Sequence, residues 1–359
     1  MAETKYVGKW NEQEVLDRIE HVRRQAPRIR DEAINMSHGA GGKATHTLIE
    51  ALFQPAFGNS MGDQAIFDVN GSTLAVTTDT YVVSPLFFPG GNIGELAING
   101  TVNDLAVGGA EPLYITCGFV LEEGLEVALL RQVVEAMAAA AEAAGVKLVA
   151  GDTKVVPRGK GDKIFINTTG IGLIREPDRL GIGKVVTGDA ILVTGPIGDH
   201  GTAIMLARGD LDIETDLESD TAAVHTLCAA MMSAGDVHFM RDATRGGVGT
   251  VLNEIAREAN LGIAIREDAV PVRDEVRGAA EILGIDPLYV ANEGRVVAVV
   301  AGGEIGAVLD ACRAHSLGER ASVIGEVLAE PPGMVFMHTA FGGSRVVDML
   351  IGDPLPRIC

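Results

Sequence analysis

"TTDTYVVSPLFFPGGNIGELAINGTVNDLAVGGA", residues 77–110, contains the change from strand to helix that decides the fold. It continues a β-branched run that starts at residue 66, and the dipeptide Asn70-Gly71 in that run predicts a tight turn between two strands. After a loop rich in Pro and Gly, Asn92 is a suitable N-cap for a helix over the following residues. A strand pair that leads into a helix predicts layers of sheet and helix.

The same alternation extends through the rest of the chain, so the expected fold class is α/β. In the first half we expect strands at 113–123, 146–156 and 163–174, with an Ala-rich helix at 126–145. In the second half we expect strands at 190–195, 262–267, 295–302 and 321–328, and helices at 199–208, 220–233, 247–259, 274–283 and 304–314.

The 359 residues predict about two domains at ~150 residues each. The polar, Gly-rich stretch 175–189 is the best boundary. We therefore expect an N-terminal extension (1–35) that carries a short amphipathic helix, an N-terminal domain (36–180), a C-terminal α/β domain (181–342) and a tail (343–359).

The net charge is 29 − 49 = −20, which argues against binding to nucleic acid or to anionic membranes. No apolar run approaches the ~18 residues of a membrane-spanning helix, and the N-terminus is polar, unlike a signal peptide. A cytoplasmic location is expected. The four cysteines lie far apart, so they predict reduced thiols rather than a zinc site or a disulfide framework.

The chain ends in "DPLPRIC", with a cysteine as its last residue. A prenylation motif places its cysteine fourth from the end, so Cys359 does not fit that modification. With prenylation, a zinc site and a disulfide framework all unsupported, we expect Cys359 to be a reactive thiol at an accessible chain end. Pro354 and Pro356 favour an extended backbone, and Gly342, Gly343 and Gly352 are candidate hinges for a mobile arm.

Four aspartates occupy similar positions, next to or within short Gly- or Thr-containing turns: Asp63, Asp79, Asp104 and Asp152. We expect Asp79 and Asp152 at strand ends. Carboxylates that converge there are suitable ligands for Mg²⁺, which prefers oxygen atoms and usually keeps phosphate and water as further ligands. The alternative for each is a turn-forming or helix-capping aspartate.

Three further motifs are candidates for anion binding or proton transfer. The chain has no Walker A motif, but the amides of Gly41 and Gly42 in "HGAGGK" suit a phosphate cradle, unless this loop is only a hinge. Arg245 precedes a predicted helix start, where anions bind, although it also fits a surface loop. Glu293 precedes a very apolar strand, so burial would raise its pKa and suit it to proton transfer; the alternative is a turn Glu paired with Arg295.

Taken together, "HGAGGK", the 77–110 block, "CGFVLEEGL", "AGDTKVV", "RDATRGGV", "ANEG" and "PLPRIC" resemble the HypE family of hydrogenase maturation factors from residue 36 to the end of the chain. That family is similar in fold to aminoimidazole ribonucleotide synthetase and selenophosphate synthetase. The resemblance implies a two-domain fold whose N-terminal sheet forms a barrel across a homodimer. It also implies an ATP site lined by the aspartates, with Asn103, Gly41, Gly42 and Arg245 beside the nucleotide.

The resemblance further implies a reaction. A carbamoyltransferase, HypF, places a carbamoyl group on the terminal thiol, and ATP with Mg²⁺ drives its dehydration to a thiocyanate. The cyanide then passes to iron on a HypC–HypD complex. In this reading Cys359 carries the substrate, Glu293 is the base, Lys154 neutralises the phosphoryl group or moves a proton, and Asp63, Asp79, Asp104 and Asp152 hold the metal.

Two other functions are consistent with the residues. A phosphotransferase similar to selenophosphate synthetase would keep the aspartates but needs a reactive cysteine near the N-terminal Gly loop, and "HGAGGK" has none. A non-catalytic scaffold that responds to ATP would use its tail only for docking and would tolerate replacement of Cys359.

Overall fold

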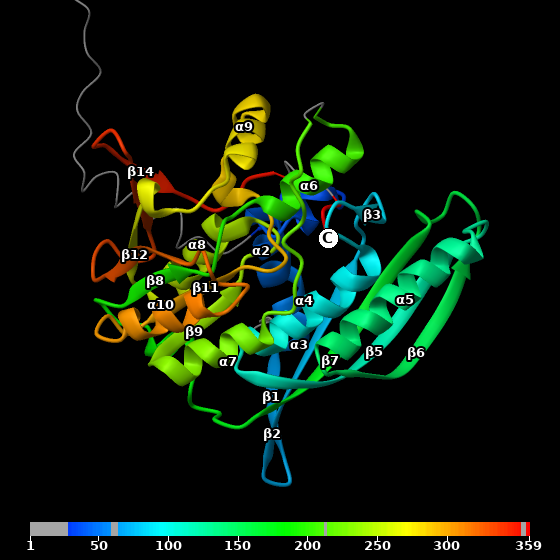
Figure 1. Cartoon of the computed structure of the whole chain (residues 1–359), viewed down its shortest axis with the longest axis horizontal. Helices are drawn as coiled ribbons and strands as arrows, with labels where there is room; N and C mark the ends of the chain where they lie inside the picture. The colour runs from blue at the N-terminus through cyan, green and yellow to red at the C-terminus, as the bar shows by residue number, and fades with distance from the viewer. Residues whose placement is uncertain (1–27, 59–63, 212–213, 353–356) are drawn as a thin grey trace, which may run out of the picture.

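The computed structural model describes residues 28–58, 64–211, 214–352 and 357–359, which form two sheets with helices packed against them (Figure 1). The expected helix of the N-terminal extension lies outside these residues. The described chain begins with short helical segments: η1 (Met36–Gly39), α2 (Lys43–Leu48), η2 (Ile49–Phe53) and α3 (Gln54–Phe57). Within the described residues, no helix is both long enough and apolar enough to cross a bilayer.

The first sheet has five strands in the order β1-β2-β7-β5-β6. Their bounds are β1 Ala65–Val69, β2 Ser72–Tyr81, β5 Ala110–Glu122, β6 Lys147–Val156 and β7 Ile164–Ile174. The predicted turn between β1 and β2 is confirmed, because Asn70 (φ 51°) and Gly71 (φ 85°) both take the left-handed conformation of a two-residue hairpin. Helices α4 (Ile93–Val107) and α5 (Val127–Ala143) cover one face of this sheet (Figure 1).

The second sheet has seven strands in the order β14-β13-β10-β12-β8-β11-β9. Their bounds are β8 Ala190–Val193, β9 Val237–Asp242, β10 Gly262–Arg266, β11 Val296–Val300, β12 Ser322–Leu328, β13 Val335–His338 and β14 Ser344–Val347. Every residue of β8 and β11 is buried, because α8 (Gly247–Ala259) packs on one face and α7 (His225–Ala234) with α10 (Ile305–Ala314) on the other. The α/β class is confirmed.

The remaining elements of the described residues are one short hairpin, three 3₁₀ turns and two α-helices. They are β3 (Phe87–Phe88), β4 (Gly91–Asn92), η3 (Ile182–Lys184), α6 (Asp199–Arg208), η4 (Glu267–Ala269), α9 (Asp274–Leu283) and η5 (Pro287–Tyr289). The helix expected from residue 220 begins at His225 instead, and the sequence reading missed β9, β13 and β14.

The tail does not begin as a free arm at Gly343. Ser344–Val347 form β14, whose backbone pairs with the whole of β13, so these four residues belong to the sheet. The last two residues, Ile358 and Cys359, are also buried, and they belong to the apolar core around α4. Both ends of the expected arm are therefore anchored in this conformation.

Helix α4 connects the two halves of the molecule. It packs on the first sheet through one side, and on α7 and β9 through the other. Asn103 makes the polar part of this contact. Its Nδ2 donates to the carbonyls of Ala222 (2.9 Å) and Glu293 (3.3 Å), and its Oδ1 accepts from the amide of Val224 (2.8 Å).

Replacing Asn103 with Ala should lower the free energy of unfolding by about 2 kcal/mol in the absence of nucleotide, because it leaves buried backbone groups without partners. Urea unfolding checks this, with Gln132→Ala, at an exposed position of α5, as the control. Unchanged stability would favour the predicted role of Asn103 at the nucleotide over a role between the domains.

Candidate functional site

A turn with two consecutive glycines places the cationic side of the site. Asp242 ends β9 and is buried, and the chain then turns through Gly246 and Gly247, both at positive φ, into α8. A Cβ on Gly247 would lie 2.5 Å from the carbonyl oxygen of Leu288, so only glycine fits there. This turn directs Arg245 to the loop at residue 39, where its Nη1 donates to the Gly39 carbonyl at 2.7 Å.

Strand β2 and helix α4 contribute a second group of polar side chains. Tyr81 donates to Oδ2 of Asp79 at 3.2 Å, and Thr77 donates to Oδ2 of Asp104 at 2.7 Å. Tyr81 is buried, and burial followed by the charges of Asp79 and Asp104 raises its pKa well above the ordinary value, so it stays a neutral donor. A Cβ on Gly100 would lie 2.3 Å from the Tyr81 hydroxyl oxygen, so this glycine lets the ring lie against α4.

Glu293 is the buried carboxyl that its sequence context predicts. Its side chain is enclosed, and Oε1 has no hydrogen-bond partner among the residues that the structure describes. Burial, then the charges of Asp242 and Asp220, raise its pKa well above the ordinary value, while Arg245 opposes the shift. Its backbone is held by Asp220, whose two oxygens accept from the amides of Glu293 (3.1 Å) and Gly294 (3.3 Å).

The expected alternative partner of Glu293 is engaged elsewhere. Nε of Arg295 lies 3.5 Å from Asp220 and donates to the carbonyl of Pro196 at 3.0 Å. Arg295 therefore helps to hold the loop that carries Glu293.

The terminal thiol lies in the same place. Cys359 is 7% exposed, and an oxygen of its terminal carboxylate accepts from the amide of Val82 at 3.0 Å. Burial raises the pKa of this thiol to about 12, Arg245 opposes the shift, and Glu293 adds to it. In turn, the charge of Cys359 is the main cause that raises the pKa of Arg245, with Glu293 and Asp79 as smaller causes. The thiol, Glu293, Asp79 and Arg245 are therefore close enough for the charge of one group to shift the pKa of another.

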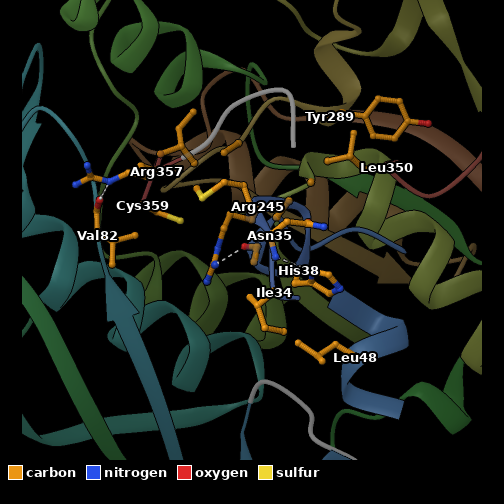
Figure 2. Close-up of a pocket in the computed structure, with 16 residues that line it drawn as sticks. Ile34, Asn35, His38, Leu48, Val82, Arg245, Tyr289, Leu350, Arg357 and Cys359 are labelled. Carbon is orange, nitrogen blue, oxygen red and sulfur yellow. Dashed lines mark hydrogen bonds between the residues drawn. The ribbon is translucent and has the colours of Figure 1, made fainter. Parts of the chain in front are cut away.

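A cavity of about 310 Å³ opens beside the thiol. It is lined by Arg245, Cys359, the neighbouring residues of the tail and residues of the loop at 34–40 (Figure 2). Figure 2 shows Arg245 next to Cys359, with a dashed line from its guanidinium to the loop at 34–40, which marks the hydrogen bond to the Gly39 carbonyl. The last residue of the chain therefore borders the cavity, and it lies close enough to Glu293 for that charge to raise the pKa of its thiol.

The glycine loop contacts the protein itself. The amide of Gly41 donates to Oγ1 of Thr45 at 3.0 Å, and the amide of Lys43 donates to the carbonyl of Leu350 at 2.9 Å. A Cβ on Gly42 would lie 2.5 Å from that same carbonyl. In this conformation Gly41 and Gly42 allow the loop to approach Arg245 and the tail closely; a phosphate cradle at these amides stays a prediction.

Asp152 and Lys154 do not reach this site within one chain. Asp152 lies in the middle of β6, so the expected strand end is wrong for it, because the β-branched residues that follow continue the strand. Across the sheet Asp152 pairs with Gly118 of β5, which pairs with Asn167 of β7, which pairs with Thr80 of β2. These residues all face away from α4. Asp79 lies on the opposite face and three strands away, roughly 14 Å along the sheet.

On that open face Lys154 and Asp152 form an exposed ion pair, with Nζ to Oδ2 at 2.6 Å. Asp63, the fourth predicted aspartate, lies outside the described residues.

Sequence reasoning missed two carboxylates of the site, Asp242 and Asp220. Asp242 is the last residue of β9, a strand-end position like the one expected for Asp79, but the sequence reading did not predict β9. Asp220 has no such signal, because only the fold brings it under the Glu293 loop.

The described residues contain no ready-made cluster of three or more His, Cys, Asp or Glu side chains for a metal ion. Asp79 and Asp104 are nevertheless suited to Mg²⁺, because this ion is usually held by one or two carboxylates together with substrate phosphates.

Comparisons with known proteins agree with this architecture. The N-terminal domain of AIR synthase related proteins matches residues 61–174, and their C-terminal domain matches residues 186–338. The carbamoyl dehydratase HypE of Bradyrhizobium diazoefficiens is 51% identical over 337 residues, covering 92% of this chain and 97% of that protein.

Two solved structures are also similar. HypE in a HypE–HypF complex has a TM-score of 0.80 and 45% identity, covering 84% of this chain and 99% of that one. HypE in complex with ATP has a TM-score of 0.77 and 45% identity, covering 91% and 100%.

The raised pKa of Glu293 predicts a pH dependence of stability. Above the ordinary carboxyl pKa, the folded chain still holds a proton that the unfolded chain has released, so the free energy of unfolding falls as pH rises toward the folded-state pKa. Glu293→Gln removes this loss.

The stability of the Gln variant relative to the wild type should therefore increase from pH 5 to 8, by up to about 1.4 kcal/mol per pH unit. Urea unfolding at several pH values measures it. Glu111→Gln, at an exposed position, should keep the wild-type slope; the same slope for Glu293→Gln would contradict the assignment.

Proposed function

Because the chain belongs to the HypE family of AIR synthase-related proteins, we propose that it supplies cyanide for the iron of [NiFe]-hydrogenases. The reaction is ATP-dependent dehydration of a carboxamide on Cys359 to a thiocyanate. The observation that carries the proposal is the position of the terminal thiol, which is buried, lines one cavity with Arg245, and lies close enough to Glu293 and Asp79 for their charges to raise its pKa. A solved HypE with ATP and a HypE–HypF complex support the nucleotide and the carbamoyltransferase partner.

The residues of the site suit the two demands of this chemistry. An amide oxygen is a poor leaving group, so it must first accept the γ-phosphoryl group and then depart as phosphate. Forming the nitrile also removes both protons from nitrogen. Glu293 is suited to this step, because a carboxylate with a raised pKa is a stronger base once it is ionised.

Positive charge at the site assists both sulfur and phosphate. Arg245 lines the same cavity as the thiol, and its charge lowers the pKa of the docked sulfur against the effect of burial. Asp79 and Asp104 would hold Mg²⁺ at the phosphates, and Asp63 remains a predicted ligand. The metal, when bound, would neutralise the charge that develops on the transferring phosphoryl group.

The docked thiol is not the form that accepts the carbamoyl group. With its pKa at about 12 the sulfur is protonated near neutral pH, and it is covered by the protein. We therefore expect carbamoylation by HypF on a released tail, followed by return of the tail for dehydration. Transfer to a HypC–HypD complex would need a second release.

The four cysteines are free, which fits the reducing cytoplasm.

The open face of the first sheet supports the expected homodimer. Phe67, Tyr114 and Val120 are each more than a third exposed there, although they lie in a regular sheet. An apolar sheet face without a covering layer usually marks an interface. A second copy that covers it would complete the barrel and bury Asp152 and Lys154 at the interface. Any role of these two residues at the nucleotide would then involve the partner subunit.

Mass spectrometry of the C-terminal peptide tests the reaction. After incubation with the carbamoyltransferase, carbamoyl phosphate and ATP, Cys359 should carry a carbamoyl group, which should then lose one water. Cys359→Ala should show neither change, and Asp104→Asn should be carbamoylated but not dehydrated. Asp310→Asn, an exposed aspartate of α10, is the control. An unmodified Cys359 beside an active carbamoyltransferase would rule out the proposal.

Light scattering after gel filtration tests the dimer. Tyr114→Glu should convert the protein to a monomer, because it places a charge in the apolar interface. Val134→Glu, at an exposed position of α5 on the helical side of the same sheet, should stay dimeric. A dimer that survives Tyr114→Glu together with Val120→Asp would show that another surface forms it.

A further inference from the structure

The last three residues of the chain are held as if they were an extra strand. They run antiparallel to residues 82–84: the amide of Val82 donates to the terminal carboxylate of Cys359 at 3.0 Å, and the amide of Ser84 donates to the carbonyl of Arg357 at 3.2 Å. Helix α6 supplies the other side. Nε2 of His200 donates to the carbonyl of Ile358 at 2.8 Å, so both carbonyls of the tripeptide and its terminal carboxylate accept a hydrogen bond from the protein.

His200 is a fully buried side chain with both ring nitrogens engaged. Its Nδ1 lies 2.8 Å from Oγ of Ser219, and that oxygen already accepts the amide of Thr221 at 3.1 Å. The Ser219 hydroxyl therefore donates to Nδ1, which leaves the proton on Nε2, facing the tail. Phe88 packs edge-on against the imidazole at 5.5 Å between centroids, which fixes the plane of the ring.

Arg208, two turns further along α6, joins the tail to the strand beside it. Its Nε donates to the carbonyl of Ser84 at 2.6 Å, and its Nη2 donates to the carbonyl of Arg357. One guanidinium therefore binds both extended segments, a geometry that Lys cannot reproduce with a single nitrogen.

The docked tripeptide also contains a strained residue. Arg357 has φ 57°, a left-handed conformation that costs an L-residue about 1 kcal/mol or more. Its side chain is held by the carbonyl of Val82 and by Asp162. Hydrogen bonds thus stabilise the docked state, and the strained backbone of Arg357, which relaxes on release, destabilises it. Such opposing contributions are expected for a segment that must leave and return.

We propose that His200 and Arg208 form a latch, here called the α6 latch, that holds residues 357–359 in the docked position and sets how often Cys359 is released. Both are positioning residues, since they contact backbone carbonyls of the tail and not the sulfur. The proposal deepens the function above and rests on it only for the reason the tail must move: carbamoylation needs a released thiol, and dehydration needs a docked one.

The latch is tested by the alkylation rate of Cys359 with iodoacetamide, followed by peptide mass spectrometry on the full chain without nucleotide. Loss of one such hydrogen bond should raise the rate roughly tenfold in His200→Leu and in Arg208→Gln. Arg208→Lys and Ser219→Ala should lie between these variants and the wild type. Arg175→Gln, which removes an arginine paired with Glu111 at an exposed site, should match the wild type.

Cys228 and Cys312, buried in the core between α7 and α10, report general loosening in the same digest. Their alkylation rates should not change. An unchanged rate for Cys359 in both His200→Leu and Arg208→Gln would overturn the latch, and so would a rise that Cys228 and Cys312 share.

A second measurement separates the latch from the reaction. In the latch variants, carbamoylation should be as fast as in the wild type or faster, while ATP-dependent dehydration of the preloaded protein should slow by a similar factor to the alkylation change. Equal slowing of both steps would contradict a latch. If the wild type shows no carbamoyl chemistry but the alkylation pattern holds, the proposed function fails and the latch stands.

Discussion

Helix α4 is buried on all sides, and the first sheet and the second half of the chain share one core through it. Burial on every side explains why its sequence shows no polar face, and why Gly94 and Gly100 occur inside it where neighbours approach too closely for a Cβ. It also carries Asn103 and Asp104 side by side, the first facing the second half of the chain and the second facing Thr77. The site is positioned by this shared core.

The chain end uses that core as a dock. Ile358 and Cys359 are counted among the same apolar residues as α4, although they are the last in the sequence. A tail that buries two side chains and whose two carbonyls and terminal carboxylate all accept hydrogen bonds has a defined resting place. The same contacts must be broken before another protein can reach the sulfur, so docking strength and reactivity are opposed.

The buried site that holds the chain end disfavours the charged forms of Glu293 and Cys359. Burial raises the pKa of Glu293 and of Cys359, and Arg245 only partly compensates. A protonated carboxyl beside a protonated thiol is a stable resting pair, because neither buried group has to carry a charge. The pair becomes reactive only when Glu293 loses its proton or the sulfur of Cys359 carries a substrate. This fits a site whose substrate arrives on the tail.

Several elements were predictable because their signals are local. The Asn70-Gly71 turn, the Asn92 cap and the Gly246-Gly247 turn follow from backbone conformations that few residues adopt, and the buried strand after Glu293 follows from its unbroken apolar run. The edge strands β13 and β14 were missed, because short strands at a sheet edge have little pattern of their own. Asp152 was misplaced at a strand end, because a Gly-Asp-Thr turn signal was overridden by pairing with β5.

The sequence by itself determined the α/β class, the carboxyl at Glu293 and the presence of a terminal thiol, since each depends on residue type and local spacing. Only the tertiary structure decided which aspartates meet, that Asp152 and Lys154 face away, and that His200 and Arg208 hold the chain end. The physical reason is that side-chain direction in a sheet alternates with register, and hydrogen bonds between residues more than 100 positions apart are set by packing rather than by neighbours in the chain.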